Sequence, residues 1–559
     1  MDLSDEMPSE SDEDDNEIES NVEKDADITS GEWKWQTGSA PEPYFSVDPM
    51  SPGRPDHMPS NAQDLRPIDF FYKLIPIDFV TFAHEETVKY FKEKQRVGLP
   101  TRFWTEREIC KDDVLSFVAL ILASGVLRSR SLSTYWAEKS PAVVKLPSFA
   151  HIMERRRFDF IRYCFHLNDN SKQPPANSDS SDSLYKVRPL YNLLQENCRK
   201  YWKLGTFVSL DESMVNWKGK SRYKQYIRSK PIRWGFKFFC LCDPETGYFK
   251  DFELYTGRKT VQEKYGLCTD IVLMLAHRNA LEWSKCVIIA DNYYTSPQLI
   301  SVLASKDIGF VGTCQLTRRH VPANLIKFNE RGPNIDRGST KSAFIILHDV
   351  NSALPNVPLF CVSWYDNRAS NFLATAGGLA KQAILRRLRN GKQEQVSCPK
   401  LVRIYTEKMG GVDLADQNKG RYSCSAILRT RKLWFRIFQG LLDIAVTNSW
   451  QLYRCSDTGN HRKNHQEFIF SICDSLLADA ASFRARLLLA RGEAADDHRI
   501  VKQKGTSRCV VCSLSKDKIR TVYMCAKCKR ALCPDECFQY FHKNDVKVSP
   551  HFKICTSRE

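Results

Sequence analysis

Two short apolar runs in this sequence are each followed at once by aspartate, and this repetition constrains the fold more than any other feature. Residues 207–210 (FVSL) precede Asp211 and Glu212, and residues 287–290 (VIIA) precede Asp291. Such runs are typical of buried strands. A single aspartate after a strand is more often a turn residue or a helix cap. Because open α/β sheets present functional groups beyond the ends of their strands, the repeated pattern predicts that the two carboxylates meet at one edge of a sheet.

A third acidic element follows two glycines in residues 409–417 (MGGVDLADQ). Gly410 and Gly411 break the chain before Asp413, and Asp416 comes three residues later. Hard cations such as Mg²⁺ prefer oxygen ligands. Two such ions about 3.5–4 Å apart stabilise both the attacking and the leaving oxygens of a phosphoryl transfer. Aspartates on three separate elements therefore predict a catalytic site that binds two Mg²⁺ ions.

The charge of the chain divides sharply near residue 30. Residues 1–30 contain thirteen acids and one lysine, a net charge of −12, whereas the whole chain carries +16, so that the remainder carries +28. A body this basic predicts a polyanionic partner. We expect the partner to be DNA and not an acidic lipid surface, because no membrane anchor is visible.

One acid-free segment, residues 213–242, concentrates this positive charge. Its cations are Lys218, Lys220, Arg222, Lys224, Arg228, Lys230, Arg233 and Lys237. They alternate with the aromatic residues Trp217, Tyr223, Tyr226, Trp234 and Phe236. Lys and Arg neutralise phosphates, and aromatic rings stack on unpaired bases. Since a solvated surface normally mixes both signs of charge, the segment predicts a DNA contact directly after Asp211.

Targeting signals and cysteine usage favour an intracellular protein without membrane association. The first residues have neither a basic region nor an apolar stretch, unlike a secretory signal peptide. The longest uncharged apolar run, residues 114–127, has 14 residues, too few to span a bilayer, and predicts a buried helix. Twenty cysteines without a signal peptide favour a reducing compartment. A DNA partner makes the nucleus the expected location.

Composition separates an N-terminal tail from a helical region. Residues 1–60 are acidic and serine-rich, then proline-rich, and are expected to be disordered. Residues 61–205 show helical periodicity, interrupted by a polar loop at 168–183. Residues 435–453 are again apolar with helical spacing, which is typical of a core helix.

A series of motifs resembles the transposases of piggyBac elements. In order they are DESMVNWKGKSRYKQYIRSKPIRWGFK, TGYFKDFELYTG, ADNYYTSPQL, FVGTCQL, VSWYDN, YTEKMGGVDLADQ and LLDIAVTNSWQLY. They keep the order of the family and cover roughly residues 70–555, and GGVDLADQ and DNYYTS are particularly specific. The resemblance implies an RNase H-like catalytic core in which Asp211, Asp291 and Asp413 are the catalytic metal ligands, with Asp416 in a supporting position.

The resemblance also implies a multidomain α/β architecture. The catalytic core would comprise residues 206–316 and 400–422, separated by an insertion subdomain at 317–399. Helical dimerisation and DNA-binding segments would comprise residues 61–205 and 423–500. The spacing agrees independently, because Asp211 and Asp291 are 80 residues apart whereas Asp291 and Asp413 are 122 apart, too far for a simple core. At the start of the expected insertion, Arg318 and Arg319 are further candidate DNA contacts.

The last segment, residues 508–559, has the cysteine spacing of a zinc-binding module. Its candidate ligands are Cys509, Cys512, Cys525, Cys528, Cys533, Cys537, His542, His551 and Cys555. Repeated C-x2-C pairs predict zinc ligation. The resemblance implies a cross-braced finger with two Zn²⁺ ions. The first would be bound by Cys509, Cys512, Cys533 and Cys537. The second would be bound by Cys525, Cys528 and His542, with either His551 or Cys555 as the fourth ligand. RING and PHD fingers share this cross-brace, which leaves a ligase or a histone reader as alternatives.

These features together favour a cut-and-paste DNA transposase. The resemblance implies that a homodimer binds the terminal inverted repeats, nicks each element end and excises the element through hairpin ends. The freed 3′-OH groups would then join target DNA, at TTAA sites if the family rule holds. Two alternatives remain: a catalytically silent DNA-binding protein derived from such a transposase, and a nuclease without strand transfer.

Overall fold

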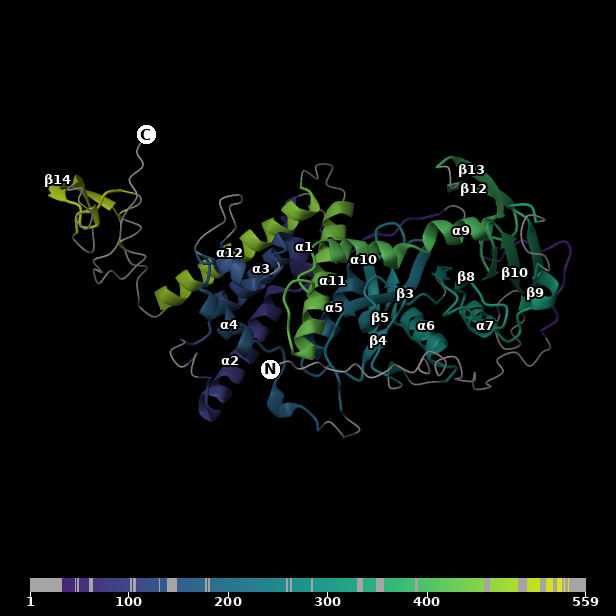
Figure 1. Cartoon of the computed structure of the whole chain (residues 1–559), viewed down its shortest axis with the longest axis horizontal. Coiled ribbons are helices and arrows are strands. Elements are labelled where there is room, and N and C mark those ends of the chain that lie inside the picture. Colours follow the sequence, from purple (N-terminus) through teal and green to yellow (C-terminus); the bar gives the residue numbers. More distant parts are fainter. Residues whose placement is uncertain are drawn as a thin grey trace, which may run out of the picture. The chain divides into compact units, whose positions relative to one another are not determined.

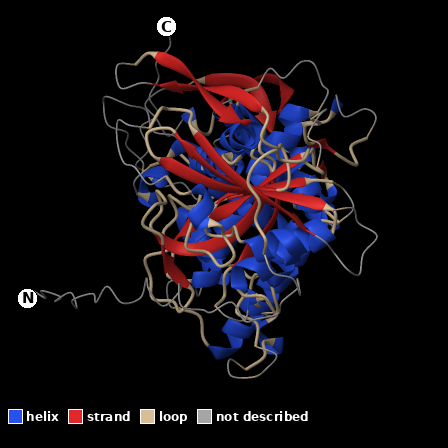
Figure 2. Cartoon of the chain, turned by 90° about the vertical axis from the view of Figure 1, so that its right-hand side faces the viewer, coloured by secondary structure: helices blue, strands red, loops and turns tan. Residues whose placement is uncertain are grey.

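The computed structural model (Figure 1) describes residues 33–541 apart from short gaps, of which the longest are 138–147, 348–355 and 491–499. The chain divides into two units, residues 1–477 and 478–559, and each is described by itself. The larger unit combines a central sheet with helices on both of its faces (Figure 2).

The central sheet has nine strands in the order β4-β5-β3-β7-β8-β11-β10-β9, and β6 pairs with β5 outside this path. The strands are β3 (Phe207–Asn216), β4 (Lys224–Tyr226), β5 (Trp234–Cys242), β6 (Phe249–Leu254), β7 (Val287–Ala290), β8 (Gly309–Thr313), β9 (Thr340–Leu347), β10 (Val357–Tyr365) and β11 (Ala369–Ala374). The three middle strands β3, β7 and β8 are parallel to one another, and the flanking strands pair antiparallel.

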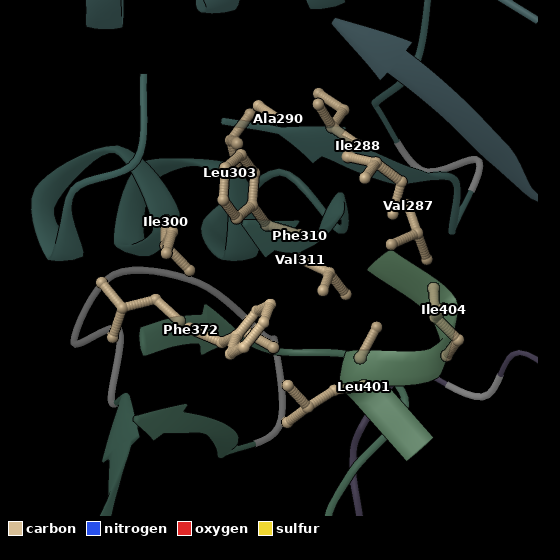
Figure 3. Close-up of a cluster of buried hydrophobic side chains, with 14 of the residues drawn as sticks. Val287, Ile288, Ala290, Ile300, Leu303, Phe310, Val311, Phe372, Leu401 and Ile404 are labelled. Atoms are coloured by element: carbon tan, nitrogen blue, oxygen red, sulfur yellow. The ribbon is translucent and has the colours of Figure 1, made fainter. Parts of the chain in front are cut away.

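The parallel centre of the sheet is buried on both faces, which explains the uninterrupted apolar run of β7. Parallel strands require crossover connections, and here α6 (Leu267–Arg278) precedes β7 while α7 (Pro297–Ser305) joins β7 to β8. Figure 3 shows Leu303 of α7 and Leu401 of α9 (Lys400–Lys408) in the cluster with Phe310 of β8. Burial of each such side chain stabilises the fold by about 1.5–3 kcal/mol.

Residues 243–247 form a hairpin, since β5 and β6 pair antiparallel on either side of them. Asp243 accepts hydrogen bonds from the backbone N–H groups of Glu245 and Thr246 at 3.1 and 2.9 Å. Gly247 closes the turn with φ +70°, a backbone conformation that glycine adopts without strain.

The segment expected to form an insertion subdomain, residues 317–399, is largely continuous with the central sheet. Strand β11 pairs antiparallel with the edge of β8, and β10 and β9 follow. Only β12 (Lys381–Arg387) and β13 (Gln393–Pro399) form a sheet of their own. A free strand edge has backbone N–H and C=O groups without partners, and in β8 these groups pair with β11.

The prediction of disorder through residue 60 is wrong for the described residues of this region. Phe45 is fully buried in the core cluster of the sheet. Gln36 forms a β-bridge with Phe344 of β9, and the indole Nε1 of Trp35 donates to the carbonyl of His320 at 2.8 Å. The average composition of the tail concealed these few aromatic residues, whose burial offsets the cost of ordering the backbone.

A group of helices packs beside the sheet. They are α1 (Pro67–Leu74), α2 (Ile77–Val97), α3 (Lys111–Leu127), α4 (Arg155–Cys164), α5 (Arg188–Lys200), α11 (Leu433–Cys455) and the part of α12 (His465–Ala490) that belongs to the larger unit, up to residue 477. The buried helix predicted for residues 114–127 is confirmed as α3. Segments far apart in sequence meet here, because the ring of Phe70 in α1 lies 5.6 Å from that of Tyr453 in α11.

A buried ionic cluster joins these helices to the sheet. The carboxylate of Asp251 on β6 is fully buried and accepts from Arg199 of α5 at 3.2 Å and from Arg278 of α6 at 2.7 Å. The amide of Asn279 donates to the same carboxylate at 2.8 Å. A buried charge is tolerated only when it is paired in this way.

The smaller unit contains the antiparallel pair β14 (Ile500–Arg508) and β15 (Arg520–Cys525). Its small core is built mainly from cysteines, with Val511 and Leu532 buried among them. A segment with so few apolar side chains needs further cross-links to hold its fold.

Candidate active site

Strands β3 and β7 position the first two predicted ligands. Their parallel pairing ends at Leu210 and Ala290, so that Asp211 and Asp291 are the next residues on two neighbouring strands. Neighbouring strands are about 4.8 Å apart, which brings the two residues to one place on the sheet. The apolar run before Asp211 suggested a strand that ends there, but the strand that carries Asp211 continues beyond it. It continues to Asn216 because β5 still pairs with it on its other side.

Helix α10 (Gly411–Arg421) brings the third ligand to the same place. Asp413 lies in its first turn. The helix begins close against β3, and a Cβ atom on Gly411 would lie 2.6 Å from Oγ of Ser209 and 2.8 Å from Cα of Pro244. This approach explains why a glycine stands there, since any side chain would push the helix away from the sheet.

The ammonium of Lys230 lies between two of the three predicted ligands. Its Nζ atom is 2.7 Å from Oδ2 of Asp211 and 3.5 Å from Oδ1 of Asp413, and its side chain is only 14 % exposed. A single positive charge thus links carboxylates that are about 200 residues apart in sequence. Carboxylate oxygens are the ligands that Mg²⁺ prefers, so the chemistry of these donors suits Mg²⁺, although the three aspartates are not among the described groups whose ligand atoms all lie within 4.8 Å of one another.

Burial shapes the protonation of the two strand aspartates. Burial, followed by the neighbouring carboxylate of Glu212, raises the pKa of Asp211 to about 8 against the opposing effect of Lys230. Burial and Glu212 also raise the pKa of Asp291. Asp413 differs from both because its side chain is 64 % exposed. The strand aspartates therefore release their protons less readily than an exposed carboxyl does.

Glu212 is an additional member of this acidic cluster, to which the sequence assigned no role. It is buried, accepts a hydrogen bond from the hydroxyl of Tyr294 at 2.7 Å, and lies 3.4 Å from Nζ of Lys237. Although burial acts in the opposite direction, Lys237 and the hydrogen bonds lower the pKa of Glu212. The acidic pair after residue 210 and the tyrosines after Asp291 were the available signals in the sequence.

Asp416 is held by protein donors. The hydroxyl of Ser213 on β3 donates to its Oδ1 atom at 2.6 Å, and Nζ of Lys419 lies 2.7 Å from the same oxygen. Lys419 is buried and also donates to the hydroxyl of Ser213 at 2.5 Å. This triad fastens α10 to β3, and so fixes the helix turn that carries Asp413.

Five of the eight predicted DNA-binding cations fall into two groups. Lys230 and Lys237 point into the acidic cluster, as their ion pairs show. Lys218, Lys220 and Arg233 are exposed.

The other three predicted contacts are Lys224, Arg318 and Arg319. The ammonium of Lys224 lies over the ring of Trp234. Arg319 is exposed. Arg318 donates to the carbonyls of Asn292 and Tyr293 at 3.2 and 3.0 Å, which supports the loop that follows Asp291.

In the smaller unit, four of the predicted zinc ligands lie together. The Sγ atoms of Cys509, Cys512, Cys533 and Cys537 lie within 4.8 Å of one another. Cys512 is 3.9 Å from Cys533 and 3.5 Å from Cys537. Four thiolates at about 2.3 Å around a tetrahedral Zn²⁺ are about 3.8 Å apart, so this group fits zinc.

For the second predicted zinc site the described residues include only Cys525, which is buried. Cys528, His542, His551 and Cys555 lie outside the described residues. Across the described part of the chain, the structure holds no helix with the length and apolarity that a membrane crossing requires.

Residues 66–450 match the family described as Transposase IS4, which is more than half of the chain. The chain belongs to this transposase family. Human PiggyBac transposable element-derived protein 3 is 28 % identical over 436 residues, which cover 74 % of this chain and 68 % of that protein. Human PiggyBac transposable element-derived protein 2 is 27 % identical over 466 residues, which cover 81 % and 73 %. The predicted kinship with piggyBac transposases is confirmed.

A solved structure of a family member shares the fold of this transposase. It is the cryo-EM structure of the piggyBac transposase synaptic complex with hairpin DNA. The two superimpose with a TM-score of 0.62 at 21 % identity, over 86 % of this chain and 98 % of that one. At this identity the likeness establishes a shared mixed α/β fold.

Proposed function

We propose that this transposase is an active enzyme that cuts and rejoins DNA with Asp211, Asp291 and Asp413 as its catalytic residues. The observation that carries the proposal is the position of Asp211 and Asp291 directly after a paired Leu210 and Ala290, with Asp413 linked to Asp211 through Lys230. Three acids on β3, β7 and α10 form one acidic cluster inside a chain of net charge +16. Such a cluster suits a metal-dependent reaction on a polyanion.

The three aspartates would bind two Mg²⁺ ions, which would stabilise the charge on attacking and leaving oxygens. The protein supplies the rest of the site. Tyr294 and Lys237 favour the ionised form of Glu212, which adds a negative charge beside Asp211. Asp416, Ser213 and Lys419 hold α10 in place, and the exposed cations after β3 would bind the phosphates of the DNA backbone.

The reaction we propose is cut-and-paste transposition on an RNase H-like core. Water attacks the phosphorus at each element end, breaking the P–O3′ bond and leaving a 3′-OH. That hydroxyl attacks a phosphorus of the opposite strand, which breaks a P–O3′ bond there and releases the flanking DNA with a 3′-OH. The hairpin formed in this way is opened by a second water. The released 3′-OH groups then join target DNA, at TTAA by analogy with the family. A nuclear homodimer that binds both terminal repeats would perform these steps, with a finger of two Zn²⁺ ions helping to bind the ends.

An excision assay tests this proposal. A reporter gene would be interrupted by the genomic DNA that flanks the gene for this chain, and precise repair would restore it. We expect restoration with the natural chain and with Asp474→Asn, an exposed aspartate outside the site. Asp291→Asn should abolish it while binding to the same DNA is retained, because the carboxylate positions metal and not DNA. Excision by Asp291→Asn would contradict the assignment.

A second candidate is a DNA-binding protein without transposase activity. The names of the human relatives, which are transposable element-derived proteins, favour it. It predicts zinc-dependent binding to the flanking DNA with no excision by the natural chain. A nuclease without strand transfer would instead cut the flanking DNA without joining the ends to a target.

A further inference from the structure

An exposed pair of aromatic rings lies at the base of the loop that carries Lys230 into the active site. Tyr226 of β4 and Trp234 of β5 are cross-strand partners, and their ring centroids are 4.7 Å apart at an angle of 44°. They are 40 % and 41 % exposed, and Ile232 between them along the chain is 37 % exposed. The neighbouring Trp217 and Phe236 are buried and already pack the sheet beneath. The outer pair therefore offers its ring surface to a ligand.

Positive charge surrounds these rings. The ammonium of Lys224 lies 4.6 Å from the ring centroid of Trp234. Arg228 and Arg233 are exposed, and neither has a carboxylate partner among the residues that the structure describes. Since residues 213–242 contain no acid, nothing in the segment offsets this charge. Aromatic faces flanked by unpaired cations are complementary to a nucleobase and its phosphates.

The same loop reaches the catalytic acids. It is closed by hydrogen bonds from the N–H of Ile227 to the carbonyl of Arg233 at 2.9 Å and from the N–H of Lys230 to the carbonyl of Ile227 at 3.3 Å. Lys230 at its tip pairs with Asp211. Tyr226 and Trp234 are each four residues from Lys230, a span of at most about 14 Å of chain. A base on these rings would thus lie within a few nucleotides of the cleavage point.

We infer that Tyr226 and Trp234 form a stacking platform for an unpaired nucleobase of the DNA substrate beside the active site. The inference rests on the proposed function, and it defines the substrate as DNA that is locally unpaired next to the bond that is cut. A base inside a duplex has both faces covered by its neighbours, so only an unstacked base can use the rings. Stacking of this kind is sequence-tolerant and changes affinity by about 5- to 150-fold per base.

Binding to two DNA probes of one mixed sequence tests the inference. One probe is fully paired, and the other contains a short unpaired stretch with 2-aminopurine in it. The full chain is used in buffer with zinc but without magnesium, so that binding is measured without cleavage. Trp234→Leu removes the ring and keeps an apolar side chain, whereas Trp234→Phe keeps a ring. Circular dichroism and thermal unfolding verify that both variants are folded.

We expect the natural chain and Trp234→Phe to prefer the unpaired probe and to quench its fluorescence. Trp234→Leu should lose about 5- to 150-fold in affinity for that probe, with the paired probe unaffected. An equal loss on both probes, or no loss on either, would overturn the inference. Preference for the unpaired probe by a chain that never excises DNA would overturn the proposed function and leave the platform intact. No binding to either probe by the natural chain would contradict both.

Discussion

The Nζ atom of Lys230 lies 2.7 Å from Oδ2 of Asp211, at the tip of the loop between β4 and β5. The side chains of the pair are 14 % and 11 % exposed, so the contact is largely shielded from solvent. A carboxylate in such a place needs a counter-charge. In this structure Lys230 supplies the positive charge, and a bound divalent cation would supply it in the metal-bound site.

Lys230→Met should therefore destabilise the chain in a metal-dependent way. Removing one partner of a buried ion pair leaves the other uncompensated, which costs about 3 kcal/mol. We expect this loss in the free energy of unfolding in magnesium-free buffer above about pH 8, where Asp211 is ionised, and a partial recovery with saturating Mg²⁺. Chemical denaturation of the natural chain, Lys230→Met and Lys230→Arg would measure it. A loss that is the same with and without Mg²⁺ would contradict the role of Lys230 as counter-charge.

The affinity for Mg²⁺ should rise with pH. Burial and Glu212 raise the pKa of Asp211 to about 8, so below that pH the folded chain holds a proton that must leave before the carboxylate can bind metal. The Mg²⁺ concentration that gives half-maximal cleavage should fall as the pH rises toward about 8 and then level off. Titrations of cleavage against Mg²⁺ at a series of pH values would show this. A constant half-maximal concentration would exclude a protonated Asp211 near neutral pH.

Asp251→Asn should weaken the packing of α5 and α6 against the sheet and so lower the free energy of unfolding. The substitution leaves Arg199 and Arg278 facing a neutral side chain in a buried cluster, which costs about 3–5 kcal/mol of unfolding free energy. Urea denaturation measures the loss. As a matched control, Asp69→Asn breaks an exposed pair with Arg66 and should cost less than about 1 kcal/mol. Equal costs for the two variants would show that the buried cluster contributes no more than a surface pair.

Cys512→Ser should remove one bound zinc ion. Cys512 lies within reach of both Cys533 and Cys537, and a tetrahedral site cannot keep its affinity with three thiolates. We expect two Zn²⁺ ions per natural chain by atomic absorption and one per variant. The variant should also lose protection from proteases within residues 508–537, because metal binding provides the folding energy of such small modules. An unchanged zinc content would show that Cys512 is not a zinc ligand.

The position of Asp211 and Asp291 after neighbouring strands could be predicted from the sequence because it depends on local pattern. Two apolar runs of strand length become parallel neighbours, and an aspartate follows each of them. The cysteine cluster was predictable for the same reason, since C-x2-C spacing already brings two thiolates to one ion. The length of β3 was not, because whether a strand continues past its first partner depends on β5, which follows in the chain.

Other features depend on contacts between distant residues and leave little trace in local pattern. Nothing near Lys230 in the sequence indicates that it pairs with Asp413, 183 residues away. The packing of Trp35 and Phe45 on the sheet was hidden because the acidic and proline-rich average of the tail masks a few aromatic residues. The strands of residues 340–374 carry no signal that tells which sheet edge they extend.

Strand cleavage by purified protein tests the central claim most directly, namely that Asp211, Asp291 and Asp413 form one metal-dependent site. The substrate is labelled DNA from the flanks of the gene for this chain, incubated with and without Mg²⁺. The account predicts Mg²⁺-dependent nicks from the natural chain and from Asp474→Asn. Each of Asp211→Asn, Asp291→Asn and Asp413→Asn should lower the cleavage rate by at least about 100-fold, a loss of about 2.7 kcal/mol, while binding the same DNA. Cleavage that survives any of the three substitutions, or proceeds without a divalent metal, would contradict it.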